Sequence, residues 1–318
     1  MLGVTRIYAK HASILLAAGL LLQLASFRSS AQDKSKRPRI TGIDHVRLYV
    51  TDVDKSREFY SKLIGVHWKG GTCFDDSRPC FTVGWEKGQA IALEKAPASG
   101  TRNWVAEIAF ATDNVEQMRG YLVAHGVTAS EVSKHACDKH VLDAHFEVRD
   151  PEGTPISFVQ RFSIPVDDPP PGAPVELRML HAGFVVKDTA AENRFYLDLL
   201  GFTLYWYGGF KDDGVDWYEI QVPDGDNWIE YMLNIPANAD HKELGVQNHF
   251  SLGVKDIHAA ADQLHKNGLQ KFDGPEIGRD GKRGLDAYDP DGTRVEVMEF
   301  TPAGKPCCHP YTAPHPTP

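Results

Sequence analysis

Four segments of the chain repeat one pattern of apolar and polar positions. Each segment begins with an apolar, strand-like stretch that ends at an aspartate, and three of the four carry a histidine seven residues before that aspartate. A polar start and a helical stretch follow, in which apolar residues recur at spacings of three and four. These helical stretches end at glycines, which are the expected residues just after a last helical turn: Gly65, Gly126, Gly201 and Gly268. The pattern predicts one supersecondary unit used four times.

Three short strands are expected after each helix, so the predicted unit is βαβββ. Two of the units finish with an Asp-Pro-x-Gly turn and an alternating strand, which begin at Asp150 and Asp289. The stretch 165–174 is rich in proline and indicates a stiff linker between two halves of two units each. The predicted boundaries are 40–161 for the first half, 162–176 for the linker, 177–301 for the second half and 302–318 for a flexible tail.

Composition limits the class of protein. The chain has 318 residues, of which 42% are hydrophobic and 24% charged, and this is typical of a globular protein with about two domains. The formal net charge of −9 argues against a nucleic-acid partner and against docking on an anionic membrane. A small-molecule substrate or ligand is the remaining kind of partner, and the oligomeric state is left open.

The N-terminus has the layout of a secretory signal peptide. Arg6 and Lys10 precede an apolar run at 14–22, and Ser29 and Ala31 stand at the −3 and −1 positions of a cleavage site. The run is short for a membrane span. We therefore predict a signal peptide over residues 1–31, export to the periplasm or outside the cell, and no stable membrane insertion after its removal. The alternative is an uncleaved N-terminal anchor, which also places the body of the protein outside the cytoplasm.

The five cysteines are compatible with export, where disulfides persist. Cys73 and Cys80 bracket a turn-rich segment and are predicted to close a small disulfide loop. Cys307 and Cys308 are adjacent, and we expect them not to pair with each other, which leaves a pairing of one of them with Cys137 open.

The repeats resemble the vicinal oxygen chelate superfamily, which includes glyoxalase I, extradiol dioxygenases and the fosfomycin- and bleomycin-resistance proteins. The resemblance covers roughly residues 40–300 and rests on the first-strand histidines, the helix that reads FY…LLG, and the turn that reads DPDG. It implies an α+β fold of two tandem glyoxalase-like domains, each a cupped mixed sheet built from two βαβββ units. It also implies that metal ligands come from the first and the last strand of each unit.

In the second half, all four of these implied positions hold residues that bind metals. They are His181 and His249 in the first strands, and Glu230 and Glu296 in the last strands. Two neutral imidazoles and two carboxylates neutralise one divalent ion, and this donor set suits Zn, Ni, Co, Mn or Fe(II). Four protein ligands leave two positions of an octahedral ion for two adjacent oxygens of a substrate.

In the first half, the same positions are expected to hold His45, Glu94, Ala106 and Ser157, and the last two bind metals poorly. Glu107 lies one residue past Ala106 and is expected to point to the other face of its strand. We therefore expect a degenerate metal site and a structural or substrate-shaping role for this half. His45 would be a remnant or a polar group bonded within the cavity.

Aromatic and basic residues of the second half are candidates for substrate binding. The aromatic candidates are Tyr205, Tyr207, Trp217 and Trp228, and packing in the core or at a rim is the alternative for each. Arg279 and Arg283 stand in a basic, glycine-rich stretch that could hold a substrate carboxylate, with a solvated loop as the alternative.

The resemblance implies three functions. The first is a metal-dependent isomerase or lyase like glyoxalase I, in which Glu230 or Glu296 moves a proton through an enediolate. The second is an extradiol Fe(II) dioxygenase with His181, His249 and Glu296 as ligands; against it, Asp286 stands where that family has tyrosine, and Glu230 fills a position that oxygen needs. The third is a non-catalytic binder like the resistance proteins.

Overall fold

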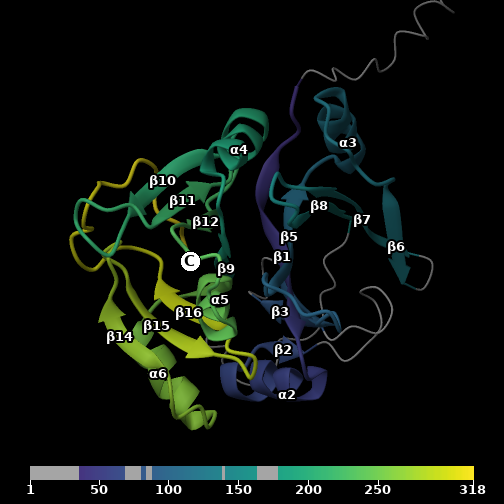
Figure 1. Cartoon of the computed structure of the whole chain (residues 1–318). Helices are drawn as coiled ribbons and strands as arrows, with labels where there is room; N and C mark the ends of the chain where they lie inside the picture. The colour runs from purple at the N-terminus through teal and green to yellow at the C-terminus, as the bar shows by residue number, and fades with distance from the viewer. Residues whose placement is uncertain (1–35, 69–79, 84–87, 138–139, 163–177) are drawn as a thin grey trace, which may run out of the picture. The chain divides into compact units, whose positions relative to one another are not determined.

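A computed structural model describes residues 36–68, 80–83, 88–137, 140–162 and 178–318 (Figure 1). The predicted signal peptide, Cys73 of the predicted disulfide, and the linker from residue 163 onward lie outside the described residues. Within the described ranges, no helix is long and apolar enough to cross a membrane.

The N-terminal half consists of two βαβββ units that share one mixed sheet. The first unit contains β1 (Ile40–Val50), α2 (Val53–Glu58) with the π-helical turn η1 (Phe59–Ile64), β2 (His67–Trp68), β3 (Cys80–Val83) and β4 (Gln89–Lys95). The second contains β5 (Val105–Thr112), α3 (Val115–Ala124), β6 (Ser133–Cys137), β7 (His140–Arg149) and β8 (Pro155–Arg161). The strand order is β2-β3-β4-β1-β5-β8-β7-β6, so the first strands of the two units, β1 and β5, lie side by side at the centre.

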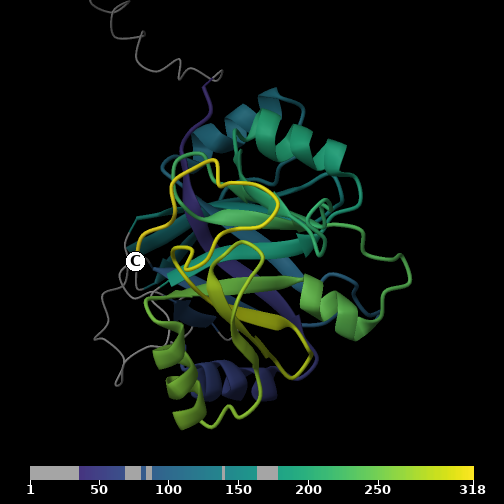
Figure 2. The ribbon, with the colours of Figure 1, turned by 90° about the vertical axis from the view of Figure 1, so that its left-hand side faces the viewer.

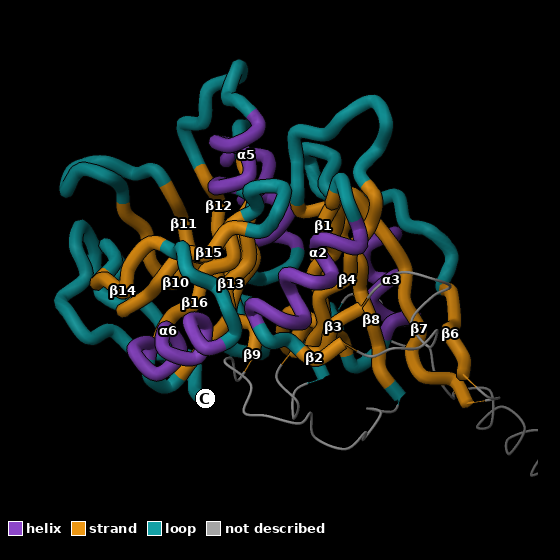
Figure 3. Tube along the Cα trace, turned by 90° about the horizontal axis from the view of Figure 1, so that it is seen from below, coloured by secondary structure: helices purple, strands orange, loops and turns teal. Residues whose placement is uncertain are grey.

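The C-terminal half repeats this architecture. Its third unit contains β9 (Arg178–Val185), α4 (Thr189–Asn193) with the π-helical turn η2 (Arg194–Leu199), β10 (Thr203–Gly208), β11 (Trp217–Gln221) and β12 (Trp228–Met232). After α5 (His241–Gln247), the fourth unit contains β13 (His249–Val254), α6 (Ile257–Lys266), β14 (Asp273–Ile277), β15 (Arg283–Tyr288) and β16 (Arg294–Glu299). The order β10-β11-β12-β9-β13-β16-β15-β14 again places two first strands at the centre (Figure 3). The predicted fold class is confirmed.

The polar residue after each first strand is the N-cap of the following helix. Asp52, Asp188 and Asp256 each accept hydrogen bonds from backbone N–H groups of the first helical turn. In the second unit the cap is Asn114, whose side chain accepts from the backbone N–H of Gln117. Capping satisfies donors that have no partner within the helix, so the cap residue fixes where each helix starts. Positions in the preceding strand can therefore be compared between units by counting back from the cap.

The two halves share one hydrophobic core and make a reciprocal pair of contacts. The hydroxyl of Tyr60 donates to the carboxylate of Asp289 over 3.0 Å, and the hydroxyl of Tyr196 lies 3.5 Å from the carboxylate of Asp150. Each tyrosine belongs to the FY helix of one half, and each aspartate opens the Asp-Pro-x-Gly turn of the other half. All four residues are buried.

Residues 302–318 pack on the C-terminal sheet, which corrects the expectation of a flexible tail (Figure 2, yellow). The backbone N–H of Thr312 donates to the carbonyl of Tyr205, and the indole N–H of Trp206 donates to the carbonyl of His309. Tyr311 packs against the buried cluster that contains Tyr205. The physical reason is that β10 is an edge strand, and the tail covers groups that this edge would leave without partners.

Cys307 and Cys308 form a disulfide with each other, so the expectation that they would not pair is wrong. Cys308 has a left-handed backbone with φ of 63°, a conformation that is uncommon for a residue with a side chain. Neither cysteine is then available to Cys137.

Candidate metal centre

The four predicted ligand positions meet because of strand register. At the centre of the sheet, β9 and β13 are antiparallel neighbours, and each is flanked by the parallel last strand of its own unit. His249 and Glu230 both pair with Gly183, from the two neighbouring strands of β9. His181 and Glu296 both pair with Ser251, from the two neighbouring strands of β13. Side chains at paired positions lie on the same face of a sheet, so all four ligand candidates point into one cavity.

The donor atoms converge closely. The two Nε2 atoms of His181 and His249 are 3.0 Å apart. An Oε2 atom of Glu230 lies 2.9 Å from Nε2 of His249 and 3.6 Å from Nε2 of His181. An Oε2 atom of Glu296 lies 3.1 Å from Nε2 of His181 and 3.9 Å from Nε2 of His249. The structure thus brings together all four residues that the sequence singled out.

His249 is prepared to act as a neutral ligand through Nε2. Nδ1 of His249 lies 3.1 Å from the carbonyl oxygen of Gln247, and this contact assigns the proton to Nδ1 and leaves the lone pair of Nε2 toward the cavity. Burial, together with the charge of Arg294, lowers the pKa of His249 and favours the neutral ring. The ring of His181 packs on the indole of Trp228, with centroids 4.7 Å apart.

The carboxylates are held in the ionised state. Burial alone would raise the pKa of Glu296, but the hydrogen bond with His181 and the charge of Arg294 outweigh burial and lower it well below its usual range. Burial also opposes ionisation of Glu230, but its close contacts with the imidazoles of His249 and His181 lower its pKa. Two ionised carboxylates and two neutral imidazoles are a donor set that fits a divalent ion.

Arg294 is a cavity residue that the sequence did not reveal. Its Nη2 atom donates to Nε2 of His249 over 2.8 Å, and its Nη1 atom lies 3.6 Å from the carboxylate of Asp286. Burial raises the pKa of Asp286 to about 6. Alternation along β16 is the signal that could have found Arg294, because it stands two residues before Glu296 and so faces the same side.

A cavity of about 310 Å³ opens next to these groups. Of the predicted substrate-binding residues, Trp217 and Arg279 line it. Tyr205 and Trp228 are instead fully buried in the cluster that also contains Leu180. Tyr207 stacks on the ring of His309 in the tail, and Arg283 lies 3.8 Å from the carboxylate of Glu299. The structure therefore brings only two of these six candidates to the cavity.

In the N-terminal half, Glu107 faces the cavity, and the expectation that it points to the opposite face is wrong. The helix cap is Asn114 and not Asp113, so the position seven residues before the cap is Glu107 and not Ala106. Strand register agrees, because Glu107 pairs with Arg47 as His249 pairs with Gly183.

Register also moves a second assignment in this half. Ala92 pairs with Arg47 as Glu230 pairs with Gly183, so Ala92, and not Glu94, is the counterpart of Glu230. Ser157 keeps its predicted place, because it pairs with Ala109 as Glu296 pairs with Ser251. The four counterparts of the ligand set are therefore a histidine, an alanine, a glutamate and a serine.

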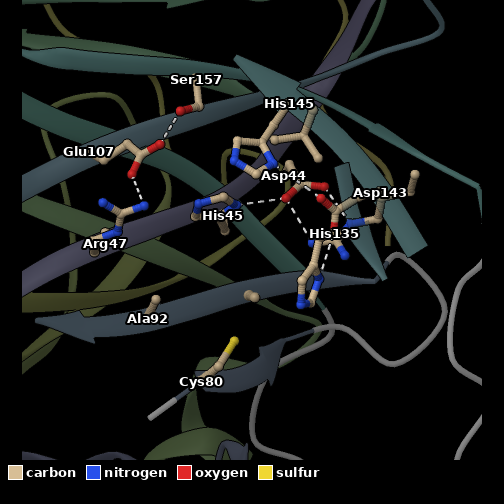
Figure 4. Close-up of a pocket in the computed structure, with 13 residues that line it drawn as sticks. Asp44, His45, Arg47, Cys80, Ala92, Glu107, His135, Asp143, His145 and Ser157 are labelled. Carbon is tan, nitrogen blue, oxygen red and sulfur yellow. Dashed lines mark hydrogen bonds and ion pairs between the residues drawn. The ribbon is translucent and has the colours of Figure 1, made fainter. Parts of the chain in front are cut away.

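The groups of the N-terminal cavity are bonded to one another (Figure 4). The guanidinium of Arg47 forms an ion pair with Glu107, to which the hydroxyl of Ser157 also donates. Nδ1 of His45 lies 2.7 Å from Asp44, and Arg161 binds the same aspartate through two nitrogens. The cavity measures about 90 Å³. Arg47 thus supplies a positive charge beside the carboxylate that stands in the place of a ligand histidine.

Comparison with known proteins identifies the family. The model of the Glyoxalase/Bleomycin resistance protein/Dioxygenase superfamily matches residues 42–158 and 178–297, one match for each half. The chain belongs to this superfamily. No curated protein matches the chain by sequence.

Two solved structures with a similar fold are extradiol dioxygenases. Homoprotocatechuate 2,3-dioxygenase from Arthrobacter globiformis is similar with a TM-score of 0.63 at 20% identity, over 86% of this chain and 84% of that chain. The enzyme of the same name from Brevibacterium fuscum, in complex with 3,4-dihydroxyphenylacetate, is similar with a TM-score of 0.61 at 20% identity, over 83% and 82% of the two chains. The likeness extends over both tandem domains and shows a common fold.

Proposed function

We propose that the C-terminal half binds one divalent metal ion through His181, Glu230, His249 and Glu296, and that the protein is an enzyme acting on a small molecule with two adjacent oxygens. The observation that carries this proposal is the close approach of four donor groups. The two Nε2 atoms of His181 and His249 are 3.0 Å apart, and a carboxylate oxygen of Glu230 and one of Glu296 lie beside them. A bound ion would supply Lewis acidity to a chelating carbonyl and its neighbouring hydroxyl.

Residues of this chain would do the remaining work. The bond from His249 to the carbonyl of Gln247 fixes the imidazole, so that its Nε2 stays directed at the ion. Arg294 is placed to donate to an oxygen of the substrate, since its guanidinium lies beside Nε2 of His249. Glu230 or Glu296 would take a proton from one substrate carbon and return it to the neighbouring carbon, which is an isomerase or lyase reaction of the glyoxalase type.

A second candidate is an extradiol Fe(II) dioxygenase, which the likeness to two homoprotocatechuate 2,3-dioxygenases over both domains favours. Its ligands would be His181, His249 and Glu296. Two features count against it: Glu230 lies 2.9 Å from Nε2 of His249, as a fourth donor, and Asp286 stands where the dioxygenase pattern has tyrosine. We therefore place the non-redox reaction first.

Metal analysis combined with oxygen uptake distinguishes the candidates. We expect one equivalent of zinc, nickel or cobalt in the purified protein and no oxygen consumption with 3,4-dihydroxyphenylacetate. Iron together with oxygen uptake would favour the dioxygenase, and loss of that uptake in His249→Ala would place it at this site. Protein that binds no divalent ion at all overturns the proposal, and a metal-loaded protein that binds chelating ligands without turnover of any points to a binder.

A further inference from the structure

The cavity beside the proposed metal centre has an excess of negative side chains. Among its described lining residues, carboxylates are Glu219, Glu230, Asp273, Glu276, Asp280, Asp286 and Glu296, whereas basic side chains are Arg279, Lys282 and Arg294. A bound divalent ion neutralises the two carboxylates that are proposed to hold it. The remaining balance decides which substituents a substrate can carry.

Each basic side chain of the cavity already has a carboxylate partner. The pairs are Arg279 with Asp212 over 2.6 Å, Lys282 with Asp280 over 2.9 Å, and Arg294 with Asp286 over 3.6 Å. Lys282 is fully buried and also donates to the hydroxyl of Tyr311 over 2.7 Å. A substrate carboxylate would have to displace one of these partners, and the displaced carboxylate would remain close by.

Two carboxylates of the cavity, Asp273 and Glu276, have no basic partner among the described residues, and a third, Glu219, shares Lys282 with Asp280. Glu219 on β11 pairs in register with Glu230 and so faces the same cavity. It is only 3% exposed, and among the described groups its Oε2 atom has no hydrogen-bond partner; Nζ of Lys282 is 3.9 Å away and lies closer to Asp280. Asp273 and Glu276 are exposed on β14 at the edge of the cavity. A buried acceptor without a donor calls for a donor from a ligand.

Charge and aromatic surface act in the same direction at the mouth of the cavity. Burial raises the pKa of Glu219 and so favours its protonated, neutral form. Asp273 and Glu276 keep the mouth of the cavity negatively charged even when Glu219 is protonated. Phe210 is 76% exposed there and meets the edge of Trp217, with ring centroids 5.2 Å apart. Aromatic rings attract organic cations through their electron-rich faces.

We propose that the substrate carries a protonated amine in addition to the two adjacent oxygens that chelate the metal, and that the cavity disfavours a substrate carboxylate. The inference rests on the proposed function, because the metal fixes the oxygen end of the molecule. Glu219 and Glu276 bind the amine end, and the rings of Phe210 and Trp217 cover it. This preference is the reverse of what the carboxylate of 3,4-dihydroxyphenylacetate would require.

Three catechols of similar size test the proposal by calorimetric binding to the zinc-loaded protein at low salt. They are dopamine with an ammonium group, 4-ethylcatechol without a charge, and 3,4-dihydroxyphenylacetate with a carboxylate. We expect dopamine to bind about tenfold more tightly than 3,4-dihydroxyphenylacetate, with 4-ethylcatechol in between, and added salt to reduce the ratio. Glu276→Gln should reduce the ratio several-fold. The exposed Glu276 provides a variant that keeps the core intact. Glu116→Gln makes the same charge change on α3 and should leave the ratio unchanged.

The outcomes separate the two proposals. If 4-ethylcatechol binds and 3,4-dihydroxyphenylacetate binds as tightly as dopamine or more tightly, the amine preference is overturned. The proposed chelation of the metal is then left in place. An equal loss of the ratio in Glu116→Gln also overturns it, because net charge and not the cavity would then be responsible. Failure of all three catechols to bind overturns the proposed chelation and the preference together.

Discussion

Gly183 on β9 stands opposite His249 on β13, and the imidazole of His249 occupies the space that a side chain at position 183 would need. In the N-terminal half the corresponding pair is Arg47 opposite Glu107. A glycine therefore leaves room for His249, a proposed metal ligand, in one cavity, whereas an arginine fills the same place in the other. The difference at this one position accompanies the presence or absence of a complete ligand set.

Replacing Gly183 by alanine should remove most of the bound metal. The added Cβ overlaps the ring of His249, so the ring must turn away from the other three donors. We expect metal affinity to fall about tenfold or more, because this is the usual loss when the surroundings no longer hold a metal ligand in its correct orientation. Metal content after dialysis against a weak chelator measures the effect. Gly120→Ala is the matched control, since a Cβ there meets nothing within 4 Å, and it should raise helix stability by roughly 0.5–1 kcal/mol. Full metal occupancy in Gly183→Ala would contradict the packing argument.

His249→Ala and His45→Ala test which half holds the metal. Losing one of four donors leaves a labile ion, so His249→Ala should lose metal and activity together. His45→Ala removes a ring that is bonded to Asp44 in the other cavity, and bound metal should stay almost unchanged. Elemental analysis of both purified variants is the measurement. The reverse result would mean that the wrong half has been chosen.

Arg47→Ala should destabilise the N-terminal half and leave bound metal unchanged. Glu107 is only 2% exposed, and without the guanidinium it is a buried charge without its cation. We expect a loss of about 2–4 kcal/mol in the free energy of unfolding. Chemical denaturation of Arg47→Ala, Glu107→Gln and the double variant measures the coupling. If the double variant is no more stable than Arg47→Ala, the buried glutamate is not the source of the loss.

Stability should fall as the pH rises from 5 to 9, in part because of Glu192. Burial, with a smaller contribution from the charge of Asp150, raises the pKa of Glu192 to about 8. The folded state thus binds this proton more tightly than the unfolded chain, whose glutamates titrate near pH 4.3. Its contribution is fully present below pH 4 and disappears as the pH passes about 8.

Melting temperatures across this range test the assignment. Glu192→Gln should flatten the decline, because the amide stays neutral at every pH. Glu116→Gln also removes a carboxylate from the first turn of a helix, but an exposed one, and should retain the wild-type slope. Parallel curves for Glu192→Gln and the wild type would exclude Glu192 as the cause.

Local signals were enough to predict the four units, and the resemblance to the superfamily then implied His181, Glu230, His249 and Glu296 as ligand positions. Helix caps, apolar periodicity and Asp-Pro-x-Gly turns each act within a few residues, so they can be recognised without knowing the rest of the fold. Glu107 was misplaced because Asp113 and Asn114 are adjacent and both can cap a helix. The choice between them depends on hydrogen bonds that only the structure reveals.

Contacts between distant segments account for the other differences. The proline-rich composition of residues 302–318 excludes regular structure but does not indicate docking, which depends on the edge of β10 and the indole of Trp206. Lys282 stands in the same basic, glycine-rich stretch as Arg279 and Arg283, yet it is buried and its Nζ atom donates to Asp280 and Tyr311. The sequence around position 282 does not indicate a hydrogen bond with Tyr311, which lies 29 residues further along the chain.

The reciprocal contacts of Tyr60 with Asp289 and of Tyr196 with Asp150 have an evolutionary consequence. Each half contacts the other through equivalent residues, a tyrosine and an aspartate, as two identical subunits do in a symmetric dimer. In such a dimer, one gene would encode both cavities, and an arginine in place of glycine beside the ligand histidine would disable both at once. With the two copies fused in tandem, position 47 and position 183 are inherited separately. One cavity can therefore change while the other keeps its four converging side chains.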